Sequence, residues 1–173
     1  MKSFRIVCMS DSHGFYKPIE KIVQKQPSAD MYVFLGDGMG YIFDNEETDI
    51  QLFLKNHPQY SNKFYSVRGN CDDDSSIPFV QIIDAPKHRI FATHGHKYSV
   101  GGGLDRIISA AKKEDCDIVL YGHTHTRYSN YTDDGMYIMN PGSCAVPRDG
   151  KKPSFGIIDL FENGTILTNI ADV

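Results

Sequence analysis

The stretch SFRIVCMSDSH, residues 3–13, is a short apolar run that ends in an aspartate and a histidine. Its first seven residues are rich in β-branched and aromatic side chains, which predicts a buried strand. Similar runs follow at residues 31–35, 63–67, 89–93 and 117–121. Between them, residues 16–26, 46–56 and 104–114 have helix-compatible spacing. This alternation predicts an α/β architecture.

The last third of the chain has a different pattern. Residues 128–131, 136–139, 155–161 and 165–170 form apolar and polar runs around the turns Asp134-Gly135 and Asn163-Gly164, as consecutive hairpins do. We therefore expect a second, antiparallel sheet. Two sheets that share one core and carry helices outside make a four-layer α/β/β/α sandwich. The expected fold is thus two mixed β-sheets flanked by helices, in a single domain over residues 1–173.

Composition excludes several classes of protein. No apolar stretch approaches the roughly 18 residues of a membrane span, and the run at residues 6–9 is too short for a signal peptide. We therefore expect a cytoplasmic protein whose four widely spaced cysteines are reduced thiols. The net charge of −4 argues against extended nucleic-acid binding.

Metal-capable side chains follow five of the predicted strands. Loops at the carboxyl ends of strands lie along one edge of a sheet, so these side chains are expected to meet. An i, i+2 spacing in extended chain also puts both members of a pair on one side. The seven candidates are Asp11, His13, Asp37, Asn70, His94, His123 and His125. His96 lies in one of these loops as well. The other two histidines, His57 and His88, lie outside the loops and are expected to be solvated.

Seven nitrogen and oxygen donors are too many for one tetrahedral zinc and suit two metal ions with a bridging carboxylate. The structural alternative is that each histidine is satisfied by a backbone partner at its strand end. Imidazole, carboxylate and amide oxygen without a well-placed thiolate favour manganese, with zinc, iron(II) and nickel as the other candidates. The donor types do not decide among them.

At these residues the sequence resembles the calcineurin-like metallophosphoesterases. The family motifs D-x-H, G-D, G-N-[HC], H and G-H-x-H occur here in order, within residues 11–14, 36–38, 69–72, 93–96 and 122–125. With NPGS at residues 140–143 and no inserted domain, the chain is most similar to the small bacterial and archaeal phosphodiesterase branch. The resemblance implies the four-layered fold, a small phosphoester substrate and, less directly, a homodimer.

The resemblance also implies a division of the ligands. Asp11, His13, Asp37 and His125 would hold the first metal, and Asp37, Asn70, His94 and His123 the second, with Asp37 as the bridge. A hydroxide held between the metals would attack phosphorus in line with the leaving oxygen, without a covalent enzyme intermediate. The residues expected to take part in catalysis are Asp37, Asn70, Cys71, His94 and His96.

Cys71 replaces the histidine of the widespread G-N-H motif, which stabilises or protonates the leaving group. A thiol is a poor acid for an alkoxide, so we expect a preference for esters whose leaving group needs little protonation. A nucleophilic Cys71 is the alternative. His96 is either a substitute acid and substrate contact or a plain turn residue. Asp72 is expected to orient a ligand histidine.

Three further alternatives stay open. Arg148 either clamps a phosphate or makes a surface salt bridge. Gly101–Gly103 either opens a helix flexibly or forms a phosphate loop, although the P-loop pattern is absent. The whole chain could also be a non-catalytic metal-binding scaffold for protein partners, as the eukaryotic retromer subunit of this fold is. All seven ligand positions are filled, which favours the enzyme.

Overall fold

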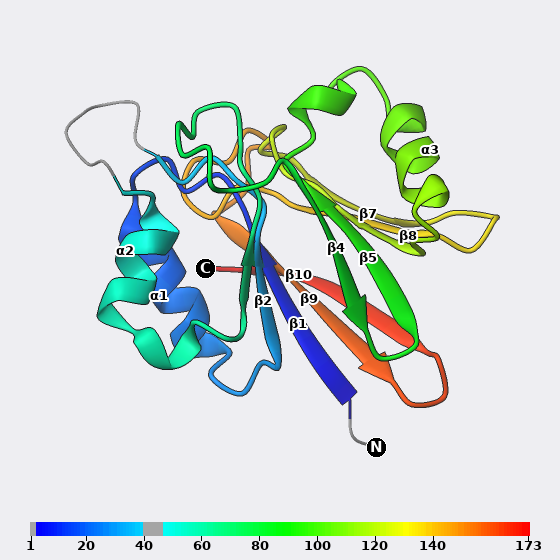
Figure 1. The fold of residues 1–173 in the computed structure, drawn as a ribbon, viewed down its shortest axis with the longest axis horizontal. Helices are drawn as coiled ribbons and strands as arrows, with labels where there is room; N and C mark the ends of the chain where they lie inside the picture. Colours follow the sequence, from blue (N-terminus) through cyan, green and yellow to red (C-terminus); the bar gives the residue numbers. More distant parts are fainter. Residues whose placement is uncertain (1–2, 40–46) are drawn as a thin grey trace.

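The computed structural model describes residues 3–39 and 47–173, which form two five-stranded sheets packed face to face between helices (Figure 1). The strands are β1 (Ser3–Met9), β2 (Met31–Phe34), β3 (Phe64–Ser66), β4 (Val80–Ala85), β5 (His88–Thr93), β6 (Ile118–Leu120), β7 (Arg127–Tyr131), β8 (Tyr137–Pro141), β9 (Ser154–Phe161) and β10 (Ile166–Asp172). The helices are α1 (Tyr16–Lys25), α2 (Asp49–Asn56) and α3 (Asp105–Lys113), with 3-10 turns η1 (Pro58–Tyr60) and η2 (His96–Tyr98).

Both sheets are mixed, as expected. Sheet A has the order β10-β9-β1-β2-β3, in which β1, β2 and β3 are parallel, β9 pairs antiparallel with β1, and β10 pairs antiparallel with β9. Sheet B has the order β4-β5-β6-β8-β7, in which β5, β6 and β8 are parallel and the two edge strands are antiparallel. The parallel strands of each sheet therefore end at a common edge.

The assignment of the last third to a separate antiparallel sheet was wrong. The hairpin of β7 and β8 joins sheet B beside β6, whereas the hairpin of β9 and β10 joins sheet A beside β1. A hairpin pattern specifies only the local pairing, and the long-range partner decides the sheet. The sequence reading also missed β4, an edge strand whose half-buried residues show no clean alternation.

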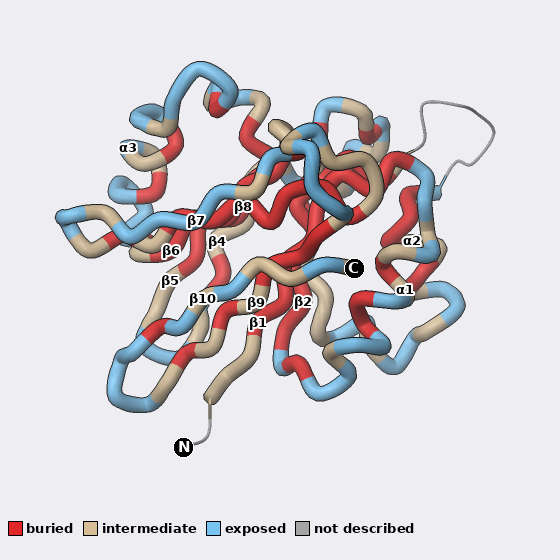
Figure 2. The backbone as a smooth tube through the Cα atoms, turned by 180° about the vertical axis from the view of Figure 1, so that it is seen from behind, coloured by how far each residue is buried: buried red, intermediate tan, exposed pale blue. Residues whose placement is uncertain are grey.

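The central strands are apolar on both faces because each face is covered. Cys8 and Val33 of sheet A and Ala92 and Leu120 of sheet B belong to the core between the sheets. The alternate residues of β1 and β2 pack with α1 and α2, on the side of sheet A seen at the left of Figure 1. In the same way α3 covers the outer face of sheet B. Figure 2 shows the buried positions concentrated in the two sheets and on the inner sides of the helices.

The start of α2 illustrates how the sequence fixes an element boundary. The Thr48 hydroxyl accepts a hydrogen bond from Gln51 N, and the Gln51 side chain accepts one from Thr48 N, so a capping box ends the preceding loop. The predicted helix began at residue 46, which lies outside the described residues. Among the described residues, no helix has the length and apolar character needed to cross a membrane.

Candidate metal centre

The loops that follow the parallel strands are joined by backbone hydrogen bonds. Asp11 N donates to Gly36 O and His13 N donates to Asp37 O, each at 3.0 Å, which ties the loop after β1 to the loop after β2. Gly122 N donates to His94 O at 3.1 Å, which ties the loops after β6 and β5. The strand ends therefore meet at one edge of the molecule, as the sequence indicated.

Five of the seven predicted ligands have left-handed backbone conformations. The φ angles of Asp11, His13, Asp37, His123 and His125 are 57°, 47°, 58°, 69° and 57°. A positive φ is uncommon in residues other than glycine and costs on the order of 1–3 kcal/mol per residue. Such conformations persist where the surrounding structure enforces them, typically at functional sites. Their concentration in these loops marks this edge as a site.

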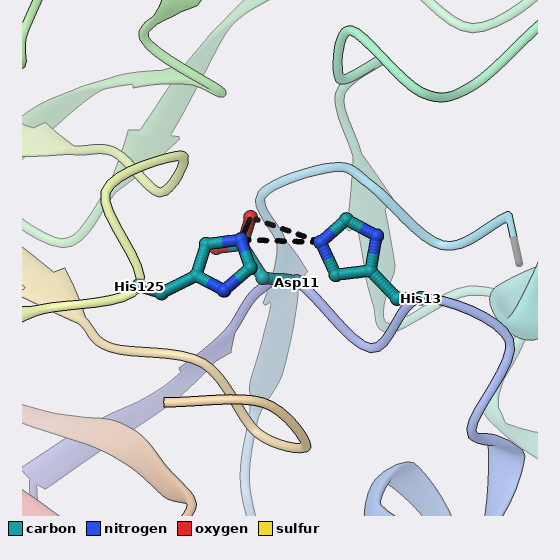
Figure 3. Close-up of side chains that lie close together, drawn as sticks. All are labelled: Asp11, His13 and His125. Atoms are coloured by element: carbon teal, nitrogen blue, oxygen red, sulfur yellow. Dashed lines mark hydrogen bonds and ion pairs between the residues drawn. The ribbon is translucent and has the colours of Figure 1, made fainter. Parts of the chain in front are cut away.

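Asp11, His13 and His125 converge on one point (Figure 3). His13 Nε2 lies 3.1 Å from His125 Nε2, and Asp11 Oδ1 lies 3.2 Å from His125 Nε2 and 4.0 Å from His13 Nε2. All three residues are buried, and Asp11 Oδ1 has no partner in hydrogen-bond geometry among the described residues. A carboxylate and two imidazoles that face one another in this way form a three-ligand group for a cation.

Asp37 lies between this group and His94. Its Oδ2 is 3.2 Å from His94 Nε2 and 3.8 Å from His13 Nε2. Asn70 Oδ1 is 3.1 Å from the same His94 nitrogen. Asp11 Oδ1, at 4.0 Å, completes a second group with Asp37 and His94. The position of Asp37 is the one that a bridging carboxylate needs, and its role as a bridge stays a prediction.

The outer nitrogens of two histidines explain why this cluster fits a cation. His94 Nδ1 lies 2.7 Å from Leu35 O and His125 Nδ1 lies 2.8 Å from Val146 O, so in the neutral rings these nitrogens carry the proton. Each Nε2 then turns a lone pair toward the carboxylates of Asp11 and Asp37. Lone pairs facing one another at this distance repel unless a proton or a metal ion lies between them.

The pKa values follow the same geometry. Burial alone would lower the pKa of His94, but the hydrogen bond and charge of Asp37, with the charge of Asp11, raise it. Burial would also lower the pKa of His125, but the interaction with Asp11 outweighs burial and raises it. Burial would raise the pKa of Asp37, yet His94 and the Cys71 N–H lower it strongly overall. The Asp37 carboxylate thus stays ionised and favours a positive charge beside it.

Cys71 lies beside the cluster. Its N–H donates to Asp37 Oδ1 at 2.8 Å, and Asn70 Nδ2 lies 3.2 Å from its sulfur. Its Sγ falls within 4.8 Å of ligand atoms of His13 and Asp37, whereas the choice of metal from the sequence assumed no well-placed thiolate. The tight turn depends on Gly69, because a Cβ there would lie 2.0 Å from Asp37 Oδ1.

His123 and His96 border the cluster from the sheet B side. The His123 ring centroid is 5.1 Å from that of His94. The backbone N–H of His123 donates to Asp11 Oδ2 at 3.2 Å. The His96 centroid is 5.4 Å from His94 and 6.2 Å from His123. Within the described residues neither ring belongs to a tight three-ligand group. The ligand role of His123 and the catalytic role of His96 therefore stay predictions.

Asp72 does not orient a histidine, contrary to expectation. Its Oδ2 accepts from Asp37 N and Gly69 N, each at 2.8 Å, and its Oδ1 accepts from Gly38 N at 2.8 Å and Met39 N at 3.0 Å. One carboxylate thereby holds the loops after β2 and β3 together. The sequence did not indicate this role, because the four N–H groups meet at one point only when the two loops come together in the fold.

Other supporting residues were not found from the sequence. Asp49 accepts from Ser12 Oγ at 2.6 Å and from Gly14 N at 2.9 Å, which fixes the loop that carries Asp11 and His13. Ser143 Oγ donates to Asp11 O at 2.7 Å. Ser143 belongs to NPGS, so this motif was the available signal for it.

The peripheral expectations had mixed outcomes. His88 is not solvated: its side chain is only 9% exposed, and its Nδ1 lies 2.6 Å from Asp117 Oδ2. His57 is half-buried and stacks on Phe53. Arg148 is exposed, its backbone N–H donates to His125 O, and no ion pair of its side chain occurs among the described residues. Gly101–Gly103 lead directly into α3.

Comparison with known proteins gives a consistent picture. The model of the calcineurin-like phosphoesterase superfamily domain matches residues 4–163. Phosphodiesterase YfcE of Escherichia coli K12 is 27% identical over 169 residues, covering 90% of this chain and 87% of that protein. A conserved protein of Streptococcus pneumoniae TIGR4, described as a predicted phosphoesterase, superposes with a TM-score of 0.74 at 21% identity, over 100% and 99% of the two chains. Vacuolar Protein Sorting 29 of Cryptosporidium parvum superposes with a TM-score of 0.71 at 15% identity, over 98% and 97%.

Proposed function

The chain belongs to the calcineurin-like phosphoesterase superfamily and is a hydrolase of phosphoric esters, and from this premise we propose that it cleaves phosphodiesters at a pair of divalent metal ions. The observation that carries the proposal is the opposition of unshared electron pairs at the centre. Asp11 Oδ1 lies 3.2 Å from His125 Nε2 and Asp37 Oδ2 lies 3.2 Å from His94 Nε2, while His13 Nε2 lies 3.1 Å from His125 Nε2.

The residues divide into two overlapping ligand sets in this proposal. Asp11, His13 and His125 hold one cation, and His94 and Asn70, with His123 at the side, hold the other. Asp37 lies between His13 and His94 and serves both. Bound divalent cations would neutralise charge on the phosphoryl oxygens and lower the pKa of a coordinated water. We propose manganese as the native ion, ahead of zinc, iron(II) and nickel, because the ligands are mainly imidazole and carboxylate.

Cys71 sets the preference for the leaving group. It occupies the position after Asn70, and its N–H is engaged by Asp37. A thiol donates a proton weakly, so an ester with an acidic leaving group is the favoured substrate. Water attacks in line with the leaving oxygen, and no covalent intermediate on Cys71 is needed. We further propose that the substrate is small and that the protein acts in the cytoplasm. We also propose that the chain forms a homodimer, which light scattering would detect.

The test is a panel of phosphodiesters and phosphomonoesters assayed with manganese after removal of bound metal with a chelator. The expected result is turnover of an aryl diester that depends on added metal, with the metal content approaching two ions per chain. Activity on monoesters alone would contradict the diesterase assignment. A fully metal-loaded protein that hydrolyses no ester in the panel would contradict the enzymatic proposal.

A scaffold role is the second candidate, because the fold is shared with a structure described as Vacuolar Protein Sorting 29. Against it weighs the fact that five of the seven predicted ligands are buried and lie in close groups, namely Asp11, His13, Asp37, His94 and His125. A metal-to-protein ratio that stays near zero, and that added manganese does not raise, would favour the scaffold over the enzyme.

A further inference from the structure

A cluster of positive charge borders the metal centre on the side of His94 and His123. Arg68 follows β3, Lys97 lies in η2 after β5, and both rest on the ring of Phe79, which precedes β4. The Arg68 Cζ atom is 3.9 Å and the Lys97 Nζ atom 3.4 Å from the centroid of that ring. Three segments from both sheets thus bring two cations to one aromatic ring.

The ring is held in place by contacts that do not involve the two charges. Thr93 Oγ1 donates to Phe79 O at 2.8 Å, and Arg68 N donates to Pro78 O at 2.8 Å. Val80, the next residue, pairs with Thr93 in sheet B. Backbone and sheet contacts therefore fix the platform, and the cationic head groups are not required to build it.

The two charges are not compensated by carboxylates. In the part of the chain that the structure describes, neither Arg68 nor Lys97 forms an ion pair, and Arg68 Nε is buried without a hydrogen-bond partner. Hydrogen bonds from Ser76 lower the pKa of Asp74, a shift to which the charge of Arg68 adds least, and the Asp74 oxygens accept from the Ser76 N–H and hydroxyl and from Gln51 Nε2. Two like charges that share one ring repel each other, and a bound anion relieves this repulsion.

The cluster is close to the atoms that would act on a substrate. The Phe79 ring centroid is 5.6 Å from that of His96, and the His96 centroid is 5.4 Å from that of His94. Two ring contacts thus lead from the cation pair to a predicted metal ligand. A group bound there would belong to the same small molecule as the phosphate at the metal centre.

We propose that Arg68 and Lys97 form a subsite for a second phosphate group of the substrate, so that phosphoesters with a further phosphate are preferred over esters with one. Arginine offers a planar fork and lysine a point charge, and both bind phosphate oxygens. Phe79 orients the two head groups through cation–π contacts. The inference rests on the proposed function, because it assumes that the scissile phosphate occupies the metal centre.

The experiment measures binding directly, by calorimetry on the manganese-loaded protein. The probes are adenosine 5′-monophosphate and adenosine 3′,5′-bisphosphate, which share every group except the second phosphate. The wild-type chain should bind the bisphosphate about tenfold or more tightly, as expected for hydrogen bonds to a charged group. Arg68→Gln combined with Lys97→Gln should reduce this ratio to within about twofold.

The controls separate a binding role from a structural one. Lys21→Gln removes the same charge from the exposed face of α1 and should leave the ratio unchanged. Lys97→Gln alone, which does not touch the loop of Asn70, should lower the ratio by about threefold or more. Equal loss of affinity for both nucleotides, or equal affinity in the wild-type chain, would overturn the subsite.

Turnover of an aryl diester in the same samples separates the subsite from the proposed function. An inactive wild-type protein that still prefers the bisphosphate would refute the diesterase and support the subsite. An active protein without the preference would refute the subsite alone.

Discussion

Replacing Asp72 by asparagine should damage the site although the two side chains have nearly the same shape. The Asp72 carboxylate accepts four backbone hydrogen bonds, two on each oxygen, from the loops after β2 and β3. An asparagine keeps one oxygen and presents an NH₂ group to the other pair of N–H donors. Two charge-assisted hydrogen bonds are therefore lost, and two backbone N–H groups face the NH₂ group of the asparagine instead of an acceptor.

The magnitude follows from the bonds that are lost. A hydrogen bond to a charged group contributes about 1.5–3 kcal/mol, and two such losses that share one site combine to about 3 kcal/mol or more. The free energy of unfolding of the metal-free protein should fall by this amount. With a urea dependence of about 2 kcal/mol per molar for a domain of this size, the unfolding midpoint should shift by about 1.5 M.

Metal binding supplies a second readout. The Asp72 carboxylate sets the position of Asp37 N relative to Gly69, which precedes Asn70, so its loss should weaken metal affinity by about tenfold or more. Asp73→Asn is the matched control, because this neighbour is exposed and its carboxylate makes no hydrogen bond to either loop among the described residues. A midpoint for Asp72→Asn no lower than that of the control, with unchanged metal affinity, would refute the reasoning.

The remaining predictions concern the same loops. Asp37→Asn should abolish turnover and weaken both metal positions, measured as metal content, whereas loss of one ion only would contradict the bridge. Gly69→Ala should prevent metal loading, because its Cβ would lie 2.0 Å from Asp37 Oδ1, and a normally loaded variant would show that the turn adapts. Cys71→Ser should lower aryl diester turnover by less than about tenfold, and a loss of several orders of magnitude would indicate a nucleophilic thiol. Alkylation of the folded, metal-free protein should modify one thiol per chain, since Cys71 is half-buried and the other three cysteines are buried; burial raises the pKa of Cys8, for example, to about 12. Modification of two or more thiols before unfolding would contradict this assignment.

The parts that sequence reading predicted are those in which one local pattern decides the outcome. The apolar run of β1, buried on both faces, ends at Met9, and Asp11 and His13 follow it at the predicted edge. The expected pattern on α3 is also confirmed, since Ile107 and Ala111 are buried against sheet B.

The parts that it missed depend on contacts between distant segments. The role of Asp72 arises only when the loops after β2 and β3 meet, and that of Asp49 only when α2 reaches the loop of Ser12. The same limit applied to β9, whose hairpin pattern is local but whose partner in sheet A is β1. His88 was misjudged because its partner Asp117 directly precedes the neighbouring strand β6.

The pairing of β1 with β9 has a consequence for how the chain is made. Ser3 lies opposite Phe161, so β1 leaves the ribosome long before β9, the strand that covers its second edge. Until then β1 carries an open edge of apolar residues, which invites pairing with another chain. Asp11 and His13 are therefore held at the end of a fully paired strand only after β9 has been made. A truncation that removes β9 and β10 should yield an aggregating product without metal affinity, even though every predicted ligand is still present.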